Sequence, residues 1–311
     1  MLYPGLFFSL TACAGNPTAA VDSVSEELDS RTETGGEAFQ HCDTWAAPEK
    51  IGVVEDILLE EISGLAISQQ NPGVMWVQED SGAEPILTAL DFSGATLGTV
   101  VLKDVLNQDW EDLAIGPCEA GICLWVADIG DNGHAREKVS ILSIPEPLVE
   151  DLKGFSLEAT PSVYQFNYPE GPQDAEALVV DPHGQPYVLT KRTDQKSRVY
   201  QIPLKANEAA QFLGDIETGP FSGLPTSTTA ADLWSDGKRL IVRGYLYSFQ
   251  IVLEDGDMKR VNEGTATQVI TGLEKQGEAI AYDSQNRRIL HISEGENPDI
   301  WQIKCDNERS K

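Results

Sequence analysis

Short apolar stretches separated by turn residues recur along residues 50–305. They show the two-residue alternation, or the continuous apolar character, of β-strands and no helical period. Five of them share one pattern, in which a small or acidic pair precedes an aliphatic residue and a short strand. These five are Ile62–Ala66, Trp110–Ala114, Ala175–Val179, Ala230–Trp234 and Gly277–Ala281.

A turn and further strand signals follow each of the five segments. Second strands are predicted at Val74–Gln78, Leu124–Ala127, Tyr187–Thr190, Leu240–Val242 and Ile289–Ile292. Third strands are predicted at Ile86–Leu90, Val139–Ile144, Arg198–Ile202, Leu246–Val252 and Ile300–Ile303. Fourth strands are predicted at Thr96–Leu102, Ser162–Tyr168, Gln211–Ile216 and Thr267–Thr271. Four strands in roughly 45–65 residues are typical of a β-propeller blade.

The repeat therefore predicts an all-β protein, a propeller of five blades. The fifth unit ends after its third strand, and Ile51–Leu59 precedes the first unit. We expect this N-terminal segment to be the outer strand of the last blade, closing the ring. Six blades would result if the long second spacing held an irregular blade, and a two-sheet sandwich is an alternative that would not need the repeat.

The first residues carry an apolar run that ends in Leu10-Thr11-Ala12-Cys13. This resembles the lipobox of bacterial lipoprotein signal peptides. The resemblance implies that residues 1–13 are a signal peptide with its lipobox, that Cys13 is lipidated, and that, with Ala14 following, the protein is anchored in the outer membrane of the cell envelope. The alternative is an apolar terminus with an isolated cysteine.

Residues 14–41 contain six acidic side chains and one Arg among Ser, Thr and Gly. Because so few apolar groups cannot offset the ordering entropy, we expect a disordered acidic tether. A single propeller domain is predicted over residues 42–306, followed by a tail at 307–311.

Five cysteines are present. With Cys13 lipidated, four remain, and four cysteines allow three pairings. Cys118 and Cys123 flank a predicted hairpin turn, while Cys42 and Cys305 lie at the two ends of the domain, so we expect the pairs 118–123 and 42–305. Such disulfides indicate an oxidising compartment. A zinc site is the alternative, but no second Cys/His pair has fitting spacing.

The charge balance of 22 basic and 50 acidic residues gives a net charge of −28. This argues against nucleic acid as a partner and against electrostatic docking on anionic lipid, so the expected membrane contact is the lipid anchor alone. No apolar run reaches the roughly 18–20 residues of a membrane-spanning helix.

Two motifs are specific: Asp109-Trp110-Glu111-Asp112-Leu113-Ala114 and Asp128-Ile129-Gly130-Asp131-Asn132. With Ile144-Pro145-Glu146-Pro147 and the other repeat segments, over about residues 60–300, they resemble a family of secreted bacterial β-propeller lipoproteins. More distantly the chain is similar to SdiA-regulated and to phytase-like or esterase-like propellers. The resemblance implies the propeller fold and no particular activity.

In a propeller, the loop entering the innermost strand and the loop between the second and third strands open on one face, which we call the mouth. Candidate residues from both loops should converge there. The metal candidates are Glu111, Glu176, Glu278, Asp128, Asp131 and Asn132. The ligand-binding candidates are Glu61, Asp80, Asp112, Lys191, Arg192, Asp232, Arg243 and Glu294.

Gathered carboxylates repel one another unless a cation neutralises them, and calcium takes oxygen ligands from several chain segments. The expected cofactor is therefore a divalent cation, calcium. A salt-bridged channel balanced by Lys191, Arg192 and Arg243, or an acid/base site without metal, are the alternatives. The Asp128–Asn132 loop could wrap a cation or form ordinary turns, and it is not a full EF-hand loop because Val139 stands where a bidentate Glu would be.

Nucleophilic catalysis is not favoured, because no Gly-x-Ser-x-Gly elbow is present and the four His are scattered. His291 is expected to be a packed strand residue, and five Trp residues at strand positions are expected in the core.

The leading hypothesis is an envelope propeller that binds a divalent cation and a small-molecule or peptide ligand at the mouth. One alternative is a metal-dependent hydrolase of phosphoesters, lactones or esters, with Glu111 or Glu176 as catalytic base. The other is a scaffold for envelope proteins.

Overall fold

Each predicted repeat forms one antiparallel sheet in the computed structural model, which describes residues 42–152, 156–205, 208–218, 227–272, 274 and 276–306. The chain divides into two units, Met1–Ala38 and Phe39–Lys311. The predicted signal peptide with Cys13, the tether at 14–41 and the tail at 307–311 lie outside the described residues.

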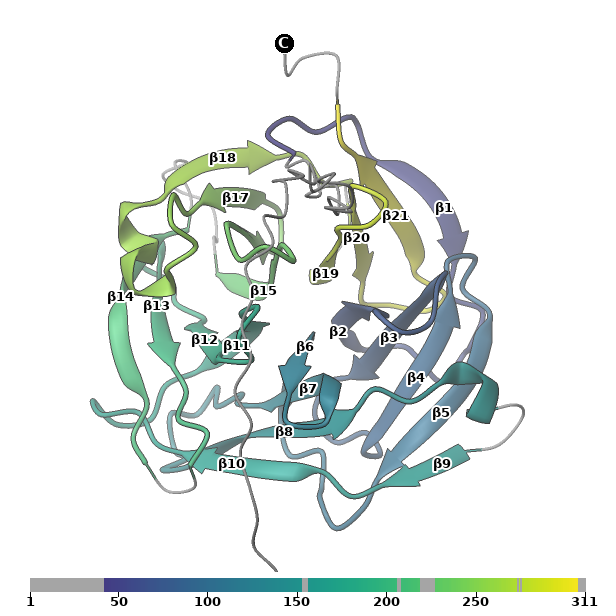
Figure 1. Ribbon diagram of the computed structural model, residues 1–311, viewed down its shortest axis with the longest axis horizontal. Coiled ribbons are helices and arrows are strands. Elements are labelled where there is room, and N and C mark those ends of the chain that lie inside the picture. The colour runs from purple at the N-terminus through teal and green to yellow at the C-terminus, as the bar shows by residue number, and fades with distance from the viewer. Residues whose placement is uncertain are drawn as a thin grey trace, which may run out of the picture. The chain divides into compact units, whose positions relative to one another are not determined.

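Five sheets surround a central channel as the blades of a propeller, which confirms the predicted fold class (Figure 1). Blade 1 contains β2 (Ile62–Ile67), β3 (Val74–Glu79), β4 (Ile86–Asp91) and β5 (Thr96–Leu102). Blade 2 contains β6 (Trp110–Cys118), β7 (Gly121–Asp128), β8 (Val139–Pro145) and β10 (Ser162–Phe166). Blade 3 contains β11 (Ala175–Val180), β12 (Pro186–Thr190), β13 (Lys196–Gln201) and β14 (Gln211–Glu217). Blade 4 contains β15 (Thr228–Leu233), β16 (Arg239–Gly244), β17 (Ser248–Val252) and β18 (Thr265–Val269).

Blade 5 joins the two ends of the domain. It contains β19 (Gly277–Asp283), β20 (Arg288–Ser293), β21 (Asp299–Lys304) and the N-terminal β1 (Glu49–Val53). The closing strand is thus confirmed, although it ends at Val53 and residues 54–59 lead to the mouth instead. Both predicted disulfides are present, Cys42–Cys305 beside the closing strand and Cys118–Cys123 at the β6–β7 turn.

The long second spacing is explained without a sixth blade. After β8 the chain forms the short 3-10 helix η1 (Val149–Leu152), and then β9 (Ser156–Ala159) adds a fifth strand, parallel to β5, to the outer edge of blade 1. A second 3-10 helix, η2 (Met258–Glu263), precedes β18. Among the described residues, no helix has the length and apolar character needed to cross a bilayer.

The core lies between the faces of neighbouring blades. Four of the five Trp residues expected in the core are fully buried, namely Trp76, Trp110, Trp125 and Trp234. Trp301 is only partly buried, because it stands on the third strand of blade 5 beside the mouth loops. His291 is buried beside it on β20, as expected for a packed strand residue.

Candidate functional site

The innermost strand of every blade carries a β-bulge at the same place, near the mouth. At the bulge one residue, or two in blade 2, has no partner on the neighbouring strand, and the side chain at this position is turned toward the channel. The skipped position holds Ser63, Glu111, Glu176, Thr229 and Glu278 in blades 1 to 5, with Asp112 sharing the bulge in blade 2. Three blades therefore present a carboxylate to the mouth at this position, and two present a hydroxyl.

Three carboxylates from two adjoining blades converge beside the bulge of blade 2. Side-chain oxygens of Asp80, Asp109 and Glu111 all lie within 4.8 Å of one another. Asp80 follows β3, and Asp109 directly precedes β6. Gly130 backs the group, because a Cβ there would lie 1.9 Å from Glu111 Oε1 and 2.6 Å from Asp109 Oδ2. We call Asp80, Asp109 and Glu111 the acid triad.

Burial and mutual repulsion keep the triad from ionising freely. Burial raises the pKa of Glu111 well above its ordinary value, and the negative charges of Glu176, Asp80 and Asp109 raise it further. Burial also raises the pKa values of Asp80 and Asp109. In the described part of the chain no Lys or Arg forms an ion pair with any of the three. The triad is therefore short of positive charge.

Glu176, next to Glu111, is the bulge acid that forms an ion pair among the described residues. Lys191 Nζ lies 2.5 Å from Glu176 Oε1 and 5.4 Å from the ring centre of Tyr245. Burial raises the pKa of Glu176 to about 7, even though Lys191 opposes this shift. Burial alone would lower the pKa of Lys191, but the neighbouring Glu176 carboxylate raises it above its usual range. The pair can thus hold or release one proton near neutral pH.

Glu278 and Glu294 complete the acidic mouth on blade 5. Gln276 Nε2 donates a hydrogen bond to Glu278 Oε1 at 3.2 Å and another to Glu294. Burial raises the pKa of Glu278 to about 8, and the charges of Glu176 and Glu294 add to the effect. Burial, with the charges of Asp80 and Glu61, raises the pKa of Glu294 to about 7.

These shifts predict how the metal-free protein responds to pH. The folded state keeps protons on Glu176, Glu278 and Glu294 that the unfolded state, with ordinary carboxyl pKa values, loses from about pH 4.5 upward. The melting temperature in a chelator should therefore fall by several degrees between about pH 5.5 and about pH 8. Glu278→Gln, which titrates no longer, should show a smaller fall. An equal fall in both proteins would contradict the shift assigned to Glu278.

Two ligand-binding candidates occupy the channel instead of the mouth. Asp112 is fully buried, and it accepts hydrogen bonds from backbone N–H groups of its own blade and of blades 3 and 4. Asp232 stands three residues beyond the bulge at Thr229, toward the other end of the channel, and accepts from the N–H groups of Leu233 and Tyr282. The repeat pattern matched Ala231 to the bulge position of blade 4, two residues after the actual bulge at Thr229. The expectation that Asp232 lies at the mouth was therefore wrong.

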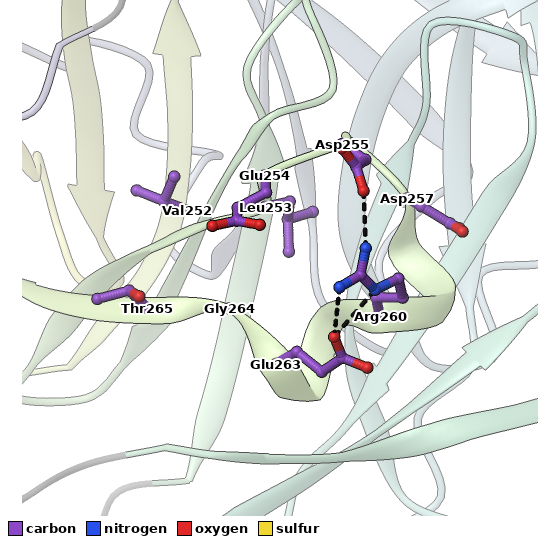
Figure 2. A pocket seen from close by; sticks show the side chains of 9 residues that line it. All are labelled: Val252, Leu253, Glu254, Asp255, Asp257, Arg260, Glu263, Gly264 and Thr265. Carbon is purple, nitrogen blue, oxygen red and sulfur yellow. Dashed lines mark hydrogen bonds and ion pairs between the residues drawn. The ribbon is translucent and has the colours of Figure 1, made fainter.

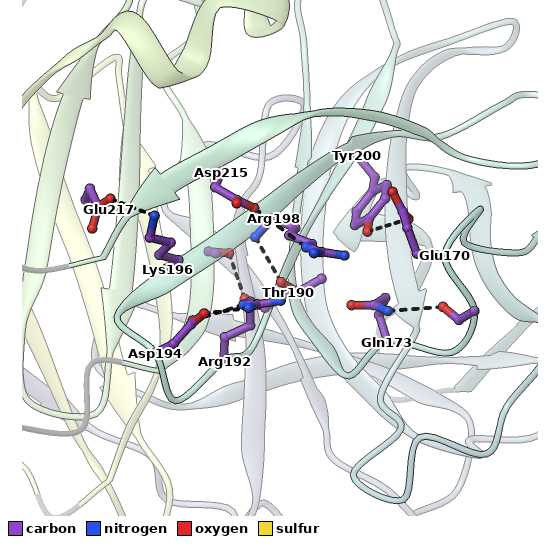
Figure 3. Close-up of polar contacts among 12 residues, drawn as sticks. Glu170, Gln173, Thr190, Arg192, Asp194, Lys196, Arg198, Tyr200, Asp215 and Glu217 are labelled. Atoms are coloured by element: carbon purple, nitrogen blue, oxygen red, sulfur yellow. Dashed lines mark hydrogen bonds and ion pairs between the residues drawn. The ribbon is translucent and has the colours of Figure 1, made fainter.

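The cationic candidates other than Lys191 are paired away from the triad. Arg192 pairs with Asp194 at 2.5 Å in the β12–β13 loop of blade 3 (Figure 3). Arg243 is buried and forms an ion pair with Glu274, which also faces His291. The alternative was a channel in which Lys191, Arg192 and Arg243 balance the acids. Of these three cations, Lys191 pairs with a mouth acid, Glu176.

The carboxylates of the Asp128–Asn132 loop already accept hydrogen bonds from donors within the protein. Asp128 pairs with Arg136 at 2.8 Å, and Asp131 accepts from the backbone N–H groups of Ala135 and Arg136. Asn132 is exposed. These carboxylates therefore stabilise their own loop, which in turn places Gly130 against the triad. Glu61 is exposed in the loop before β2, where its carbonyl oxygen accepts from Asp80 N.

The outer edge of blade 4 carries a further cavity, which is lined by one Arg and four carboxylates, those of Glu254, Asp255, Asp257 and Glu263. It has a volume of about 350 Å³, and Arg260 stands in it between two carboxylates (Figure 2). Arg260 lies 2.7 Å from Asp255 and 2.6 Å from Glu263. Unlike the triad, this cavity therefore holds a cationic side chain that is paired with two of its carboxylates.

The sequence interpretation missed Asp109 and Tyr245. Asp109 stands in the same six-residue motif as Glu111, two positions before it, so the motif itself was the signal that could have found it. Tyr245 follows β16, directly before the third strand that was predicted to begin at Leu246, and no sequence signal pointed to it.

No family model matches the sequence, and no curated protein matches it. The PQQ-bound aldose sugar dehydrogenase from Streptomyces coelicolor is similar in structure, at 11% identity and a TM-score of 0.47, over 83% of this chain and 98% of that one. Selenomethionine-substituted virginiamycin B lyase from Staphylococcus aureus is similar at 12% identity and a TM-score of 0.38, over 84% of this chain and 74% of that one. The family resemblance of the sequence stays a prediction, and what is established is a five-bladed β-propeller in which three carboxylates lie close enough together to hold a metal ion.

Proposed function

We propose that this protein is a propeller that binds calcium at the acid triad and, through the bound ion, a small-molecule or peptide ligand at the mouth. The observation that carries the proposal is the convergence of Asp80, Asp109 and Glu111 without a cationic partner in the described residues. Buried carboxylates that lack a countercharge either stay protonated or take up a cation.

The donor set favours a hard cation. Carboxylate oxygens suit calcium, magnesium and manganese, whereas zinc and copper sites usually include His or Cys. Calcium takes six to eight oxygens, more than three monodentate carboxylates supply. The remaining positions are thus available to water or to an oxygen of the ligand.

A ligand bound to the ion would find further contacts around the mouth. Lys191 and the Tyr245 ring lie beside Glu176, the neighbour of Glu111. On blade 5 a cavity of about 560 Å³ is lined by Glu294, Ser293, Asn297 and the partly buried Trp301. These groups combine polar and aromatic surface, as small-molecule and peptide sites do.

Removing triad carboxylates should remove the effect of calcium on stability. Calcium at about one hundred times its dissociation constant should stabilise the parent by about 2.7 kcal/mol, or about 5–10 °C in melting temperature. In Asp80→Asn/Asp109→Asn this increase should be lost. The matched control is Asp255→Asn/Asp257→Asn, which removes two carboxylates from the loop after β17, at the end of blade 4 opposite the bulge (Figure 2). An undiminished calcium effect in the triad variant would place the ion elsewhere.

A second candidate function, a scaffold for envelope proteins, is favoured by the apolar rim of the mouth. The most exposed large hydrophobic side chains in the described part of the chain all lie in mouth-face loops. They are Ile57 at 71%, Leu58 at 75%, Leu106 at 79% and Ile270 at 67% exposure. Apolar groups around an acidic centre suit a protein partner with a basic segment. Leu58→Ser/Leu106→Ser should weaken such a partner's binding and leave the calcium effect intact.

The location is proposed in two steps. The two disulfides indicate an oxidising, extracytoplasmic compartment. Lipidation of Cys13 and anchoring in the outer membrane rest on the lipobox resemblance alone.

A further inference from the structure

The end of the channel opposite the mouth forms a second, separate cavity. Its volume is about 270 Å³, and four blades contribute to its lining. Its lining is mixed: the partly exposed side chains of Ile67, Ile115 and Ile122 and the buried Leu233 form the apolar part, and polar side chains stand beside them, those of Ser68, Gln69, Ser235, Ser284 and Gln285. Asp112, fully buried between this cavity and the mouth acids, bonds across the inner strands of three blades and separates the two ends.

Asp232 is one of the two charged residues in the lining of this cavity, the other being Asp283. It lines the cavity and stays partly accessible. Each of its oxygens accepts one backbone hydrogen bond, at 2.7 Å from Leu233 N and 2.7 Å from Tyr282 N. A carboxylate offers about four lone-pair positions, so two remain for a donor on a ligand.

The surroundings leave Asp232 without a countercharge. Among the described residues it forms no ion pair, whereas Asp283, also in the lining, pairs with Arg288 at 2.8 Å. Burial raises the pKa of Asp232 to about 7, which shows how poorly the site tolerates an unpaired negative charge. A cationic donor would relieve that cost, and an anion would add to it.

We propose that this cavity binds small amines that carry an apolar group, with the ammonium on Asp232 and the apolar group between the isoleucine side chains. Small-molecule sites combine apolar side chains with a few polar groups that orient the ligand. The geometry is independent of the acid triad, so this site does not depend on calcium at the mouth.

The test uses hexylammonium as probe, with hexanol and hexanoate as matched neutral and anionic compounds. Isoleucine-methyl NMR of the full chain locates binding, because Ile67, Ile115 and Ile122 line the cavity while Ile57 and Ile270 report on the mouth face. Millimolar hexylammonium should shift the cavity methyls and bind at least tenfold more tightly than hexanol. Hexanoate should leave the methyls unshifted.

Two variants make the test decisive. Asp232→Asn should remove the preference for hexylammonium over hexanol, and Ile122→Trp, which fills the cavity and keeps Asp232, should abolish binding of both. The calcium effect on melting should persist in Ile122→Trp, so failure here is distinguishable from failure of the triad proposal. Shifts confined to Ile57 and Ile270, equal binding of hexylammonium and hexanol, or unchanged binding in Ile122→Trp would each overturn the proposal.

Discussion

Replacing Cys42 and Cys305 with serine is expected to lower the free energy of unfolding by about 5 kcal/mol. The bond closes a loop with a sequence separation of 263 residues, so in the unfolded chain it removes a large conformational entropy. It also holds the segment before β1 against β21, where Trp45 bridges Cys305 and stacks on Tyr282. Without the bond, the ring is closed by the β1–β21 hydrogen bonds and this packing alone.

The second disulfide provides the matched control. The sequence separation of Cys118 and Cys123 is only 5, and the same entropy relation gives about 2 kcal/mol for their bond. Denaturant unfolding of the two double-serine variants measures the difference directly. An equal loss of unfolding free energy in both variants would show that the Cys42–Cys305 bond does not stabilise the closure of the ring.

The fold could be predicted because each blade repeats the same local signals. Alternation and turn residues located β5 at its observed bounds, Thr96–Leu102, and assigned β1 to the last blade. The strand β9 was missed because Ser156–Ala159 is short and mostly exposed, and it exists only by pairing with β5, more than fifty residues earlier. The pairing of two strands so far apart in the sequence leaves no periodic pattern in either segment from which it could be predicted.

The site was less predictable because a bulge changes which residues face the channel. One inserted residue reverses the orientation of everything after it. In blade 4 the small residues Ala230 and Ala231 matched the repeat pattern, while the bulge lies at Thr229, so Asp232 was assigned to the wrong end. Asp109 reaches the triad because the Gly130 loop packs against it, a contact between segments that spacing alone does not reveal.

Asp112→Ala is expected to lower the free energy of unfolding by about 4 kcal/mol. The innermost strands are edge strands, so N–H groups that face the channel have no partner strand. Asp112 accepts hydrogen bonds from Leu113 N at 2.8 Å, Leu178 N at 2.9 Å and Ala231 N at 3.2 Å, which joins blades 2, 3 and 4. Alanine would leave these donors buried without an acceptor, at about 1–3 kcal/mol for each unsatisfied group.

Asp91→Ala separates the effect of burial from the effect of losing three hydrogen bonds. Asp91 also accepts from three backbone N–H groups, those of Ser93, Gly94 and Ala95, but it does so in a solvent-accessible turn. Water can replace the carboxylate there, so we expect a loss of only about 1 kcal/mol. Urea unfolding of both variants gives the comparison. A loss for Asp112→Ala no larger than that for Asp91→Ala would mean that water enters the channel and satisfies the strand edges, and that Asp112 does not join the three blades.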